Sequence, residues 1–226
     1  MADQKVAPPQ KLEDRLNNFE HWVDENRKVL TYVVGGLFVV VAAYFGFTKL
    51  YLDPKNDEAN NQSFMAQKWF GMDSLNLALN GDGNFPGFLS IMDEYKWTEA
   101  ANLAHYYTGV IYLKQGKFED AIDQLKDFHG KDKMVSNMAY GAIGDAYSEL
   151  GKNDEAIDYY KKAAYHFENE LTTPMFLKKA GMLLEYTKKN AEAKKLYEEI
   201  KSRYPNTNEG REMDKYIARV EAGSNS

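Results

Sequence analysis

The sequence predicts an all-α protein, in which one N-terminal transmembrane helix precedes an array of three to four helix pairs and a C-terminal capping helix. Three observations predict this architecture. No charged residue interrupts the twenty positions between Lys28 and Lys49. After residue 100, a pattern of Gly, Tyr and Ala returns at spacings of 35 and then 37 residues. The mean hydropathy of −0.60 excludes a protein with several membrane spans.

The composition narrows the possible functions. The chain has 226 residues, a formal net charge of −6 and no cysteine. Its acidity lies in residues 53–226, which carry 22 Lys and Arg against 28 Asp and Glu. This balance argues against nucleic acid, because nucleic-acid binding needs a basic patch. The lack of cysteine excludes disulfides, thiolate catalysis and cysteine-ligated zinc.

Residues 1–28 are predicted to form a cytoplasmic amphipathic segment. The helix "KLEDRLNNFEHWVDENRK" is expected to begin after Pro8-Pro9. Its apolar side chains recur at steps of three or four, at Leu12, Leu16, Phe19 and Val23. Such a stripe suits contact with a partner or a helix lying in the membrane plane. A plain extension of the anchor would show the same stripe.

Residues 29–52 are predicted to be the transmembrane anchor. As a helix, the apolar run would span about 30 Å, the thickness of a bilayer core. A core helix of a soluble protein would show a polar face, which the stretch from Val33 to Phe47 lacks. A cleaved signal peptide has a shorter apolar run and a small-residue cleavage site behind it. We therefore predict an uncleaved anchor.

The basic residues around the span predict its orientation. Arg27 and Lys28 adjoin its N-terminal end, whereas only Lys49 adjoins the other end. Because basic residues favour the cytoplasmic side, the N-terminus is predicted to lie in the cytoplasm. In a bacterium the C-terminal domain would then be periplasmic and held to the inner membrane. The inverted orientation stays open, and it would make the protein a cytoplasm-facing adaptor.

Small residues within the span define a predicted transmembrane contact face. Gly35, Ala42 and Gly46 are seven and then four residues apart, so they share one side of a helix. Small side chains allow a second helix to approach closely. Gly and Ala are also common in spanning helices in general, which is the ordinary alternative.

Residues 61–220 are predicted to form the helical array, after a short polar linker at 53–60. "NQSFMAQKWFGMDSLNLAL" and "PGFLSIMDEY" are predicted as a degenerate first pair around the turn "NGDGNF". At the other end, one apolar face predicts a helix that caps the last repeat. That face consists of Met213, Tyr216, Ile217 and Val220. Residues 221–226 are predicted to be a disordered tail.

Three copies of one pattern fill the middle of the array. "HYYTGVIYLKQGKFEDAIDQLKDF" from His105 aligns with "YGAIGDAYSELGKNDEAIDYYKKA" from Tyr140, and a third copy starts at Leu177. Glycine inside a helix normally costs about 1 kcal/mol against alanine. A neighbouring helix that crosses closely at each glycine explains this cost. The small residues are Gly109, Gly144 and Gly181 on the first helices and Ala121, Ala156 and Ala193 on the second.

This pattern resembles the tetratricopeptide repeat, a helix pair of about 34 residues. Gly116 and Gly151 suit the turn between the two helices of a pair. The third copy departs from the pattern, because Lys188 stands at the turn position.

In tetratricopeptide arrays the first helices line a concave surface that binds partners. Carrying those positions over predicts a partner groove that mixes Met, Tyr and charged residues, without the clustered Lys, Asn and Arg of a carboxylate clamp. Met and Tyr suit adaptable and rigid apolar contacts respectively. The alternative is that several of these residues are buried under a neighbouring helix. The groove residues are Leu103, Tyr106, Val110, Leu113, Lys114, Met138, Gly141, Asp145, Ser148, Glu149, Met175, Lys178, Met182, Glu185 and Tyr186.

No pattern of an enzyme or cofactor site stands out. The sequence has no phosphate loop, G-x-S-x-G, H-E-x-x-H or tandem metal-ligand spacing. The four histidines are scattered, and Asp82 alone offers too few ligands for calcium. We therefore expect no catalytic residue, no cofactor and no metal, and protein partners in place of nucleic acid or a small-molecule substrate.

The whole layout resembles the YfgM-like family over about residues 10–220. Phrases such as "LALNGDGNFPGF" and "YLKQGKFEDAI" add to the resemblance. Members of that family are single-span inner-membrane proteins with a periplasmic tetratricopeptide domain, associated with the Sec translocon and the periplasmic chaperone PpiD. The resemblance implies a non-enzymatic accessory subunit that assists handover of translocated proteins. The alternative is a structural scaffold of another envelope assembly or secretion complex.

Overall fold

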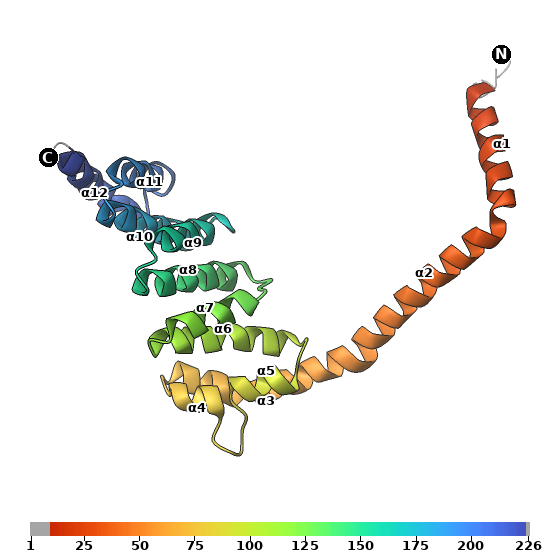
Figure 1. The fold of residues 1–226 in the computed structure, drawn as a ribbon, viewed down its shortest axis with the longest axis horizontal. Helices are drawn as coiled ribbons and strands as arrows, with labels where there is room; N and C mark the ends of the chain where they lie inside the picture. Colours follow the sequence, from red (N-terminus) through yellow and green to blue (C-terminus); the bar gives the residue numbers. More distant parts are fainter. Residues whose placement is uncertain (1–9, 225–226) are drawn as a thin grey trace, which may run out of the picture. The chain divides into compact units, whose positions relative to one another are not determined.

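The computed structural model describes residues 10–224, with side chains from Arg15 to Gly223. The described residues form helices and no strand, which confirms the predicted all-α class (Figure 1). The chain divides into two compact units, residues 1–54 and 55–226. Residues 1–9, which hold the predicted Pro8-Pro9 boundary, lie outside the described residues, as do residues 225–226 of the predicted tail.

The N-terminal unit is helical throughout its described part. It consists of α1 (Gln10–Glu25), α2 (Arg27–Phe47) and one π-helical turn, η1 (Thr48–Leu52). None of the described side chains of α2 is buried. Its length and apolar composition are sufficient for a membrane span, and a signal sequence would meet the same criterion.

The predicted linker 53–60 is wrong in form, because these residues are the first turns of α3 (Asp53–Gly71). Ala59 is fully buried, and the Asn56 Oδ1 accepts a hydrogen bond of 2.8 Å from the Glu99 N–H. Packing and hydrogen bonding therefore begin before residue 61. A polar composition alone does not distinguish a linker from a helix with one small buried side chain.

The first helix pair is more broken than the sequence predicts. The expected helix over 61–79 is interrupted after Gly71, and Asp73 has a φ of 57°. Two short helices follow, α4 (Leu75–Asn80) and α5 (Phe88–Glu94). Between them the loop "NGDGNF" is a turn, as predicted, in which Asp82 Oδ1 accepts hydrogen bonds from two backbone N–H groups.

Three regular helix pairs and a last helix complete the array. The pairs are α6 (Glu99–Lys114) with α7 (Phe118–Asp127), α8 (Lys133–Glu149) with α9 (Asn153–Tyr165), and α10 (Thr172–Tyr186) with α11 (Asn190–Arg203). The last helix is α12 (Asn208–Ser224). It continues through most of the predicted disordered tail, because Val220 is buried and Glu221 pairs with Lys194 at 2.6 Å.

The three repeat glycines lie where the sequence predicts helices to cross. A Cβ on Gly109 would lie 2.5 Å from the Leu125 side chain. A Cβ on Gly144 would lie 2.7 Å from the Tyr160 ring, and one on Gly181 would lie 2.4 Å from the Tyr197 ring. Each glycine therefore allows the second helix of its own pair to pack closely, which confirms the repeat register.

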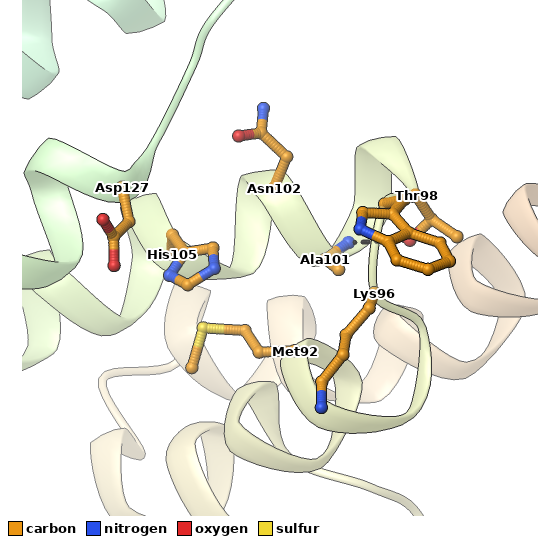
Figure 2. A pocket seen from close by; sticks show the side chains of 8 residues that line it. Met92, Lys96, Thr98, Ala101, Asn102, His105 and Asp127 are labelled. Carbon is orange, nitrogen blue, oxygen red and sulfur yellow. Dashed lines mark hydrogen bonds between the residues drawn. The ribbon is translucent and has the colours of Figure 1, made fainter.

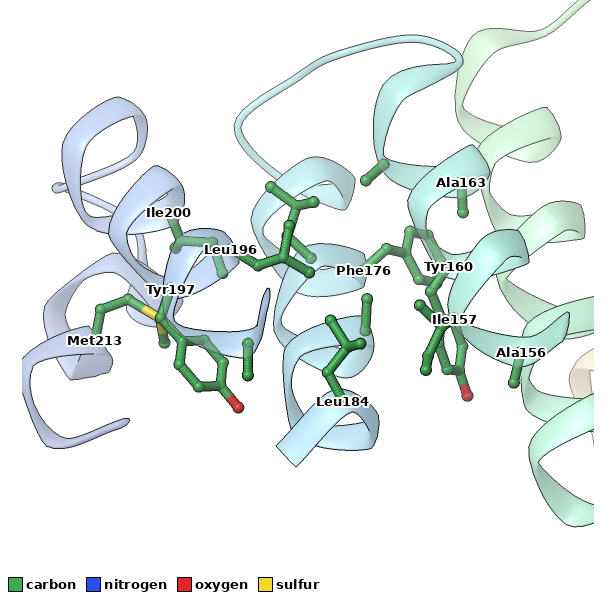
Figure 3. Close-up of a cluster of buried hydrophobic side chains, with 14 of the residues drawn as sticks. Ala156, Ile157, Tyr160, Ala163, Phe176, Leu184, Leu196, Tyr197, Ile200 and Met213 are labelled. Carbon is green, nitrogen blue, oxygen red and sulfur yellow. The ribbon is translucent and has the colours of Figure 1, made fainter. Parts of the chain in front are cut away.

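The core is divided along the array. One cluster of buried side chains joins α9, α10, α11 and α12, and Figure 3 shows Phe176 and Tyr160 facing each other within it. A second cluster joins α3, α4, α5 and α6, and a smaller one lies between α7 and α8. Each helix pair is thus held mainly by its neighbours, as in other repeat proteins.

On α6 and α8, an asparagine near the start of the helix is hydrogen-bonded to the loop that precedes the next first helix. Asn102 on α6 donates to the His129 carbonyl at 3.0 Å and accepts from the His129 N–H at 2.8 Å. At the equivalent position on α8, the fully buried Asn137 donates to the Phe167 carbonyl at 2.7 Å and to the Thr172 hydroxyl at 2.8 Å. These bonds hold the loop after α7 against α6, and the loop after α9 against α8.

The turns inside the pairs require left-handed backbone. Gly116 and Gly151 have φ values of 75° and 70°, and Lys188 has a φ of 63° at the equivalent place. A side chain there carries a steric cost of about 1–2 kcal/mol that glycine avoids.

Lys188→Gly is therefore expected to raise the free energy of unfolding by about 1 kcal/mol. Urea unfolding followed by circular dichroism measures it. Gly151→Ala is the control, and it should lower stability by a similar amount. A destabilised Lys188→Gly variant would contradict this account of the turn.

Candidate functional site

Five of the fifteen predicted groove positions meet in one hollow between three helix pairs. The hollow has a volume of about 550 Å³ and lies between the C-terminal end of α6, the C-terminal half of α8, and side chains of α9 and α10. Five predicted groove residues line it, together with Gly116, Phe118, Tyr160 and Lys179. The five are Leu113, Lys114, Asp145, Ser148 and Glu149.

A network of hydrogen bonds around Asp145 organises the hollow. The Lys179 Nζ lies 2.6 and 2.9 Å from the two carboxylate oxygens of Asp145. The Tyr160 hydroxyl donates to the same carboxylate at 2.7 Å. Burial, followed by this bond, raises the pKa of Tyr160 above its ordinary value, so the hydroxyl remains a donor at all physiological pH. Asp145 therefore joins three helices and is largely occupied by the protein itself.

The rim of the hollow carries charges of both signs. Lys114 is exposed and its Nζ lies 2.7 Å from Asp73. Glu149 is exposed on the last turn of α8. A polar floor with charges of both signs above it suits the backbone and side chains of a polypeptide better than a purely apolar ligand.

Several predicted groove residues mainly hold the repeats together. Tyr106 and Val110, as well as Leu113, are half-buried and pack against the cluster between α7 and α8. Met175 packs in the same way against the large C-terminal cluster. Leu103 is half-buried as well. A side chain on a first helix can face either the concave surface or the next repeat. The repeat pattern in the sequence does not distinguish these two orientations.

Gly141 is a packing position and not a groove contact. It is buried, and a Cβ on it would lie 2.0 Å from a ring carbon of Phe176. The α10 helix therefore covers this part of α8. The expectation of a partner contact at residue 141 was wrong because the next repeat occupies the space.

Two further predicted groove residues form ion pairs with the last helix. Lys178 pairs with Glu212 of α12 at 2.5 Å. Glu185 pairs with Arg219 of α12 at 2.5 Å and accepts from the Tyr197 hydroxyl at 3.2 Å. These ion pairs attach α12 to α10, so Lys178 and Glu185 are engaged by the chain's own last helix.

Three predicted residues remain as exposed apolar side chains on the first helices. They are Met138, Met182 and Tyr186, of which Tyr186 is 75% exposed. In the N-terminal unit, Gly35, Ala42 and Gly46 lie on α2, and a Cβ on either glycine would meet no atom within 4 Å. No described residue of this chain packs against these two glycines, which belong to the predicted contact face of α2.

Some of the side chains that line the hollow were not predicted from the sequence. Tyr160 lines it from a second helix, and Lys179 lines it from a face of α10 that was not assigned to the groove. Asn102 and Asn137 were missed too, although their spacing of 35 residues was available as a signal. No cluster of three or more metal-ligating side chains occurs among the residues that the structure describes.

The fold and the hollow define a class: an array of tetratricopeptide-type helix pairs, which serves typically as a protein-interaction module. Residues 76–215 match the family described as T7SS, ESX-1 secretion system protein EccA1, N-terminal domain. The chain belongs to this family.

Two further comparisons agree with a repeat array. The chain is 31% identical over 116 residues to "Uncharacterized protein ycf37" of Guillardia theta, covering 50% of this chain and 64% of that protein. It therefore spans less than two thirds of that relative. A crystal structure of nearly identical TPR-like repeats from Podosopora anserina, described as kinesin light chain, has a TM-score of 0.53 and 9% identity. The match covers 75% of this chain and 88% of the other, and it supports the fold alone.

Proposed function

We propose that the protein is a non-enzymatic, membrane-anchored interaction module that binds polypeptide partners at the hollow beside Asp145. The observation that carries the proposal is the hollow itself, because five groove positions meet in it around a fixed polar floor. Residues 29–52 would be the anchor and residues 1–28 its cytoplasmic extension. The array, proposed as residues 61–220 and preceded by the first turns of α3, would lie in the periplasm of a bacterium.

Within this class, the resemblance to the YfgM-like family favours one place of action. The protein would be an accessory subunit at the Sec translocon, where it would assist handover of translocated proteins to a periplasmic chaperone. The face of Gly35, Ala42 and Gly46 would contact other membrane helices. A fusion of alkaline phosphatase to the C-terminus tests the orientation, since the enzyme becomes active only outside the cytoplasm.

A second candidate is a structural scaffold of another envelope or secretion complex. The family match favours it, because the matched family is described by a secretion-system protein. A scaffold would bind one folded partner, whereas a subunit that assists handover would bind unfolded model substrates weakly and broadly.

Co-purification from membranes in mild detergent, followed by mass spectrometry, separates the two candidates. Translocon subunits together with a periplasmic chaperone would support the accessory-subunit role. A different secretion machine without translocon subunits would support the scaffold. Recovery of neither would leave the interaction module without a partner and would contradict both.

Glu149→Arg is expected to reduce recovery of the partner bound at the hollow by about tenfold, because it reverses an exposed charge at the rim. Quantitative mass spectrometry of the co-purified proteins measures the change. Glu198→Arg is the matched control, since it makes the same charge change on the exposed surface of α11. Equal recovery with both variants would place the binding surface elsewhere.

A further inference from the structure

Trp97 is an exposed indole on a constrained turn. It lies between α5 and α6, its side chain is 76% exposed, and its φ is 70°. A bulky residue seldom adopts left-handed backbone, and such outliers concentrate where the conformation has a use. An exposed indole prefers a setting that is apolar on one side and wet on the other, as at the surface of a bilayer.

The chain itself limits how far this turn can lie from the end of the apolar span. Only four residues lead from Leu52 to Asn56, which is at most about 14 Å of chain even when fully extended. The Asn56 side chain is bonded to the Glu99 N–H, two residues from Trp97. Lys55 lies over the Tyr95 ring, 5.1 Å from its centre, on the other side of the turn. This limit holds for any angle between the two units.

The charges beside the turn are paired, although the protein as a whole is acidic. Lys96 pairs with Asp93 at 3.0 Å, and Lys55 pairs with Glu58 at 3.2 Å. Lys131, on the neighbouring loop, pairs with Glu99 at 2.8 Å. Pairing of this kind lowers the electrostatic repulsion that an acidic surface would otherwise meet at anionic headgroups.

A hollow of about 470 Å³ opens beside the turn. Figure 2 shows Met92 and Lys96 on one side of it and Ala101 and His105 of α6 on the other. Its mixture of apolar, basic and acidic side chains resembles the headgroup layer of a membrane in polarity. Large exposed apolar residues also mark the start of the next two first helices, at Met134 and Leu171.

We propose that the turn carrying Trp97 rests in the interfacial layer of the same bilayer that the apolar span crosses, with the indole at headgroup level. The contact would hold the first repeat at the membrane surface. This inference rests on the membrane anchor of the proposed function. Because the nearby lysines are already paired, the contact would depend little on salt.

Bromolipid quenching of the full-length chain in vesicles tests the proposal. The reference is Trp22→Phe, which keeps Trp97 and the buried Trp69. Subtracting the emission of Trp22→Phe/Trp97→Phe gives the signal of Trp97 alone. We expect this signal to be blue-shifted, and to lose most of its intensity when the phosphatidylcholine carries bromine near the headgroup end of its chains. Thermal unfolding of both variants checks that they fold alike.

Tyr186→Trp in the doubly substituted background is the matched control, because it places an indole at a position that is 75% exposed on the array. It lies at the opposite end of a first helix, so it should not be quenched. Equal quenching at both positions, or none at Trp97, would overturn the proposal. A blue shift without quenching, seen only when other membrane proteins are added, would assign the turn to a protein partner and would also overturn the proposal.

Flotation of the vesicles after an alkaline wash separates this result from the anchor. A chain that floats while Trp97 is not quenched keeps its anchor and loses the interfacial contact. A chain that does not float loses both.

Discussion

Asn137→Asp is expected to lower the free energy of unfolding by about 3–5 kcal/mol at pH 7, the cost of an unpaired buried charge. Asn137 is fully buried, and its amide donates to the Phe167 carbonyl and the Thr172 hydroxyl. The substitution keeps the size of the side chain and replaces the donor by a carboxylate. The introduced carboxylate would face acceptors, so the loop 166–171 would be released from α8.

The loss should depend on pH. Burial raises the pKa of a carboxyl group in the folded state, whereas the pKa of aspartate in the unfolded chain is about 3.9. The variant should therefore lose stability as the pH rises above about 4, and regain it in acid, where the neutral carboxyl can donate to Phe167. Urea unfolding of the variant and the parent protein at pH 4.5 and pH 7 measures the difference.

Asn102→Asp is the matched control for this substitution. It lies at the same register one repeat earlier, is only half-buried, and keeps the acceptor that the His129 N–H uses. Its cost should be about 1 kcal/mol, that of one lost hydrogen bond. Equal losses at residues 102 and 137 would refute the role given to burial.

Gly141→Ala is expected to destabilise the array by about 2 kcal/mol through overpacking. The added methyl group would lie 2.0 Å from the buried Phe176 ring, which itself packs in the C-terminal core cluster. Either the ring leaves its place or α8 and α10 move apart. The sign of the change in the free energy of unfolding is informative, because the same substitution inside an exposed helix normally stabilises by about 1 kcal/mol.

Gly71→Ala provides the comparison for that sign. It is the last residue of α3, and a Cβ there would meet no atom within 4 Å. This substitution should be neutral or slightly stabilising in the same unfolding experiment. A stable Gly141→Ala variant would show that the contact between α8 and α10 tolerates a larger separation than the structure has.

The repeat array could be predicted because its signal is periodic. The presence of Gly109, Gly144 and Gly181 inside helices is explained by a close crossing of a second helix. The structure places an aromatic or leucine side chain against each of these glycines. The all-α class followed directly. The apolar run could also be predicted, because its length and composition can be read directly from the sequence.

The interaction site could be predicted only in part. Five groove positions meet in the hollow, but Gly141 is covered by the next repeat and Lys178 and Glu185 are bound to α12. Whether a first-helix side chain faces a groove or a neighbour depends on the superhelix and on the last helix, and neither is encoded in a single repeat. The prediction of a linker at residues 53–60 failed for a similar reason. The helix around Ala59 is stabilised by contacts with α5 and α6, which its own amino-acid composition does not reveal.

The division of the core into separate clusters has a mechanical consequence. Neighbouring helix pairs are held together by separate clusters of buried side chains, so no single core holds the whole array together. A force applied through the chain N-terminal to α3 would be resisted first by the cluster around Trp69 and Phe88. The more distant repeats would keep their structure while that cluster yields. Under tension the protein would therefore extend in steps, one cluster at a time.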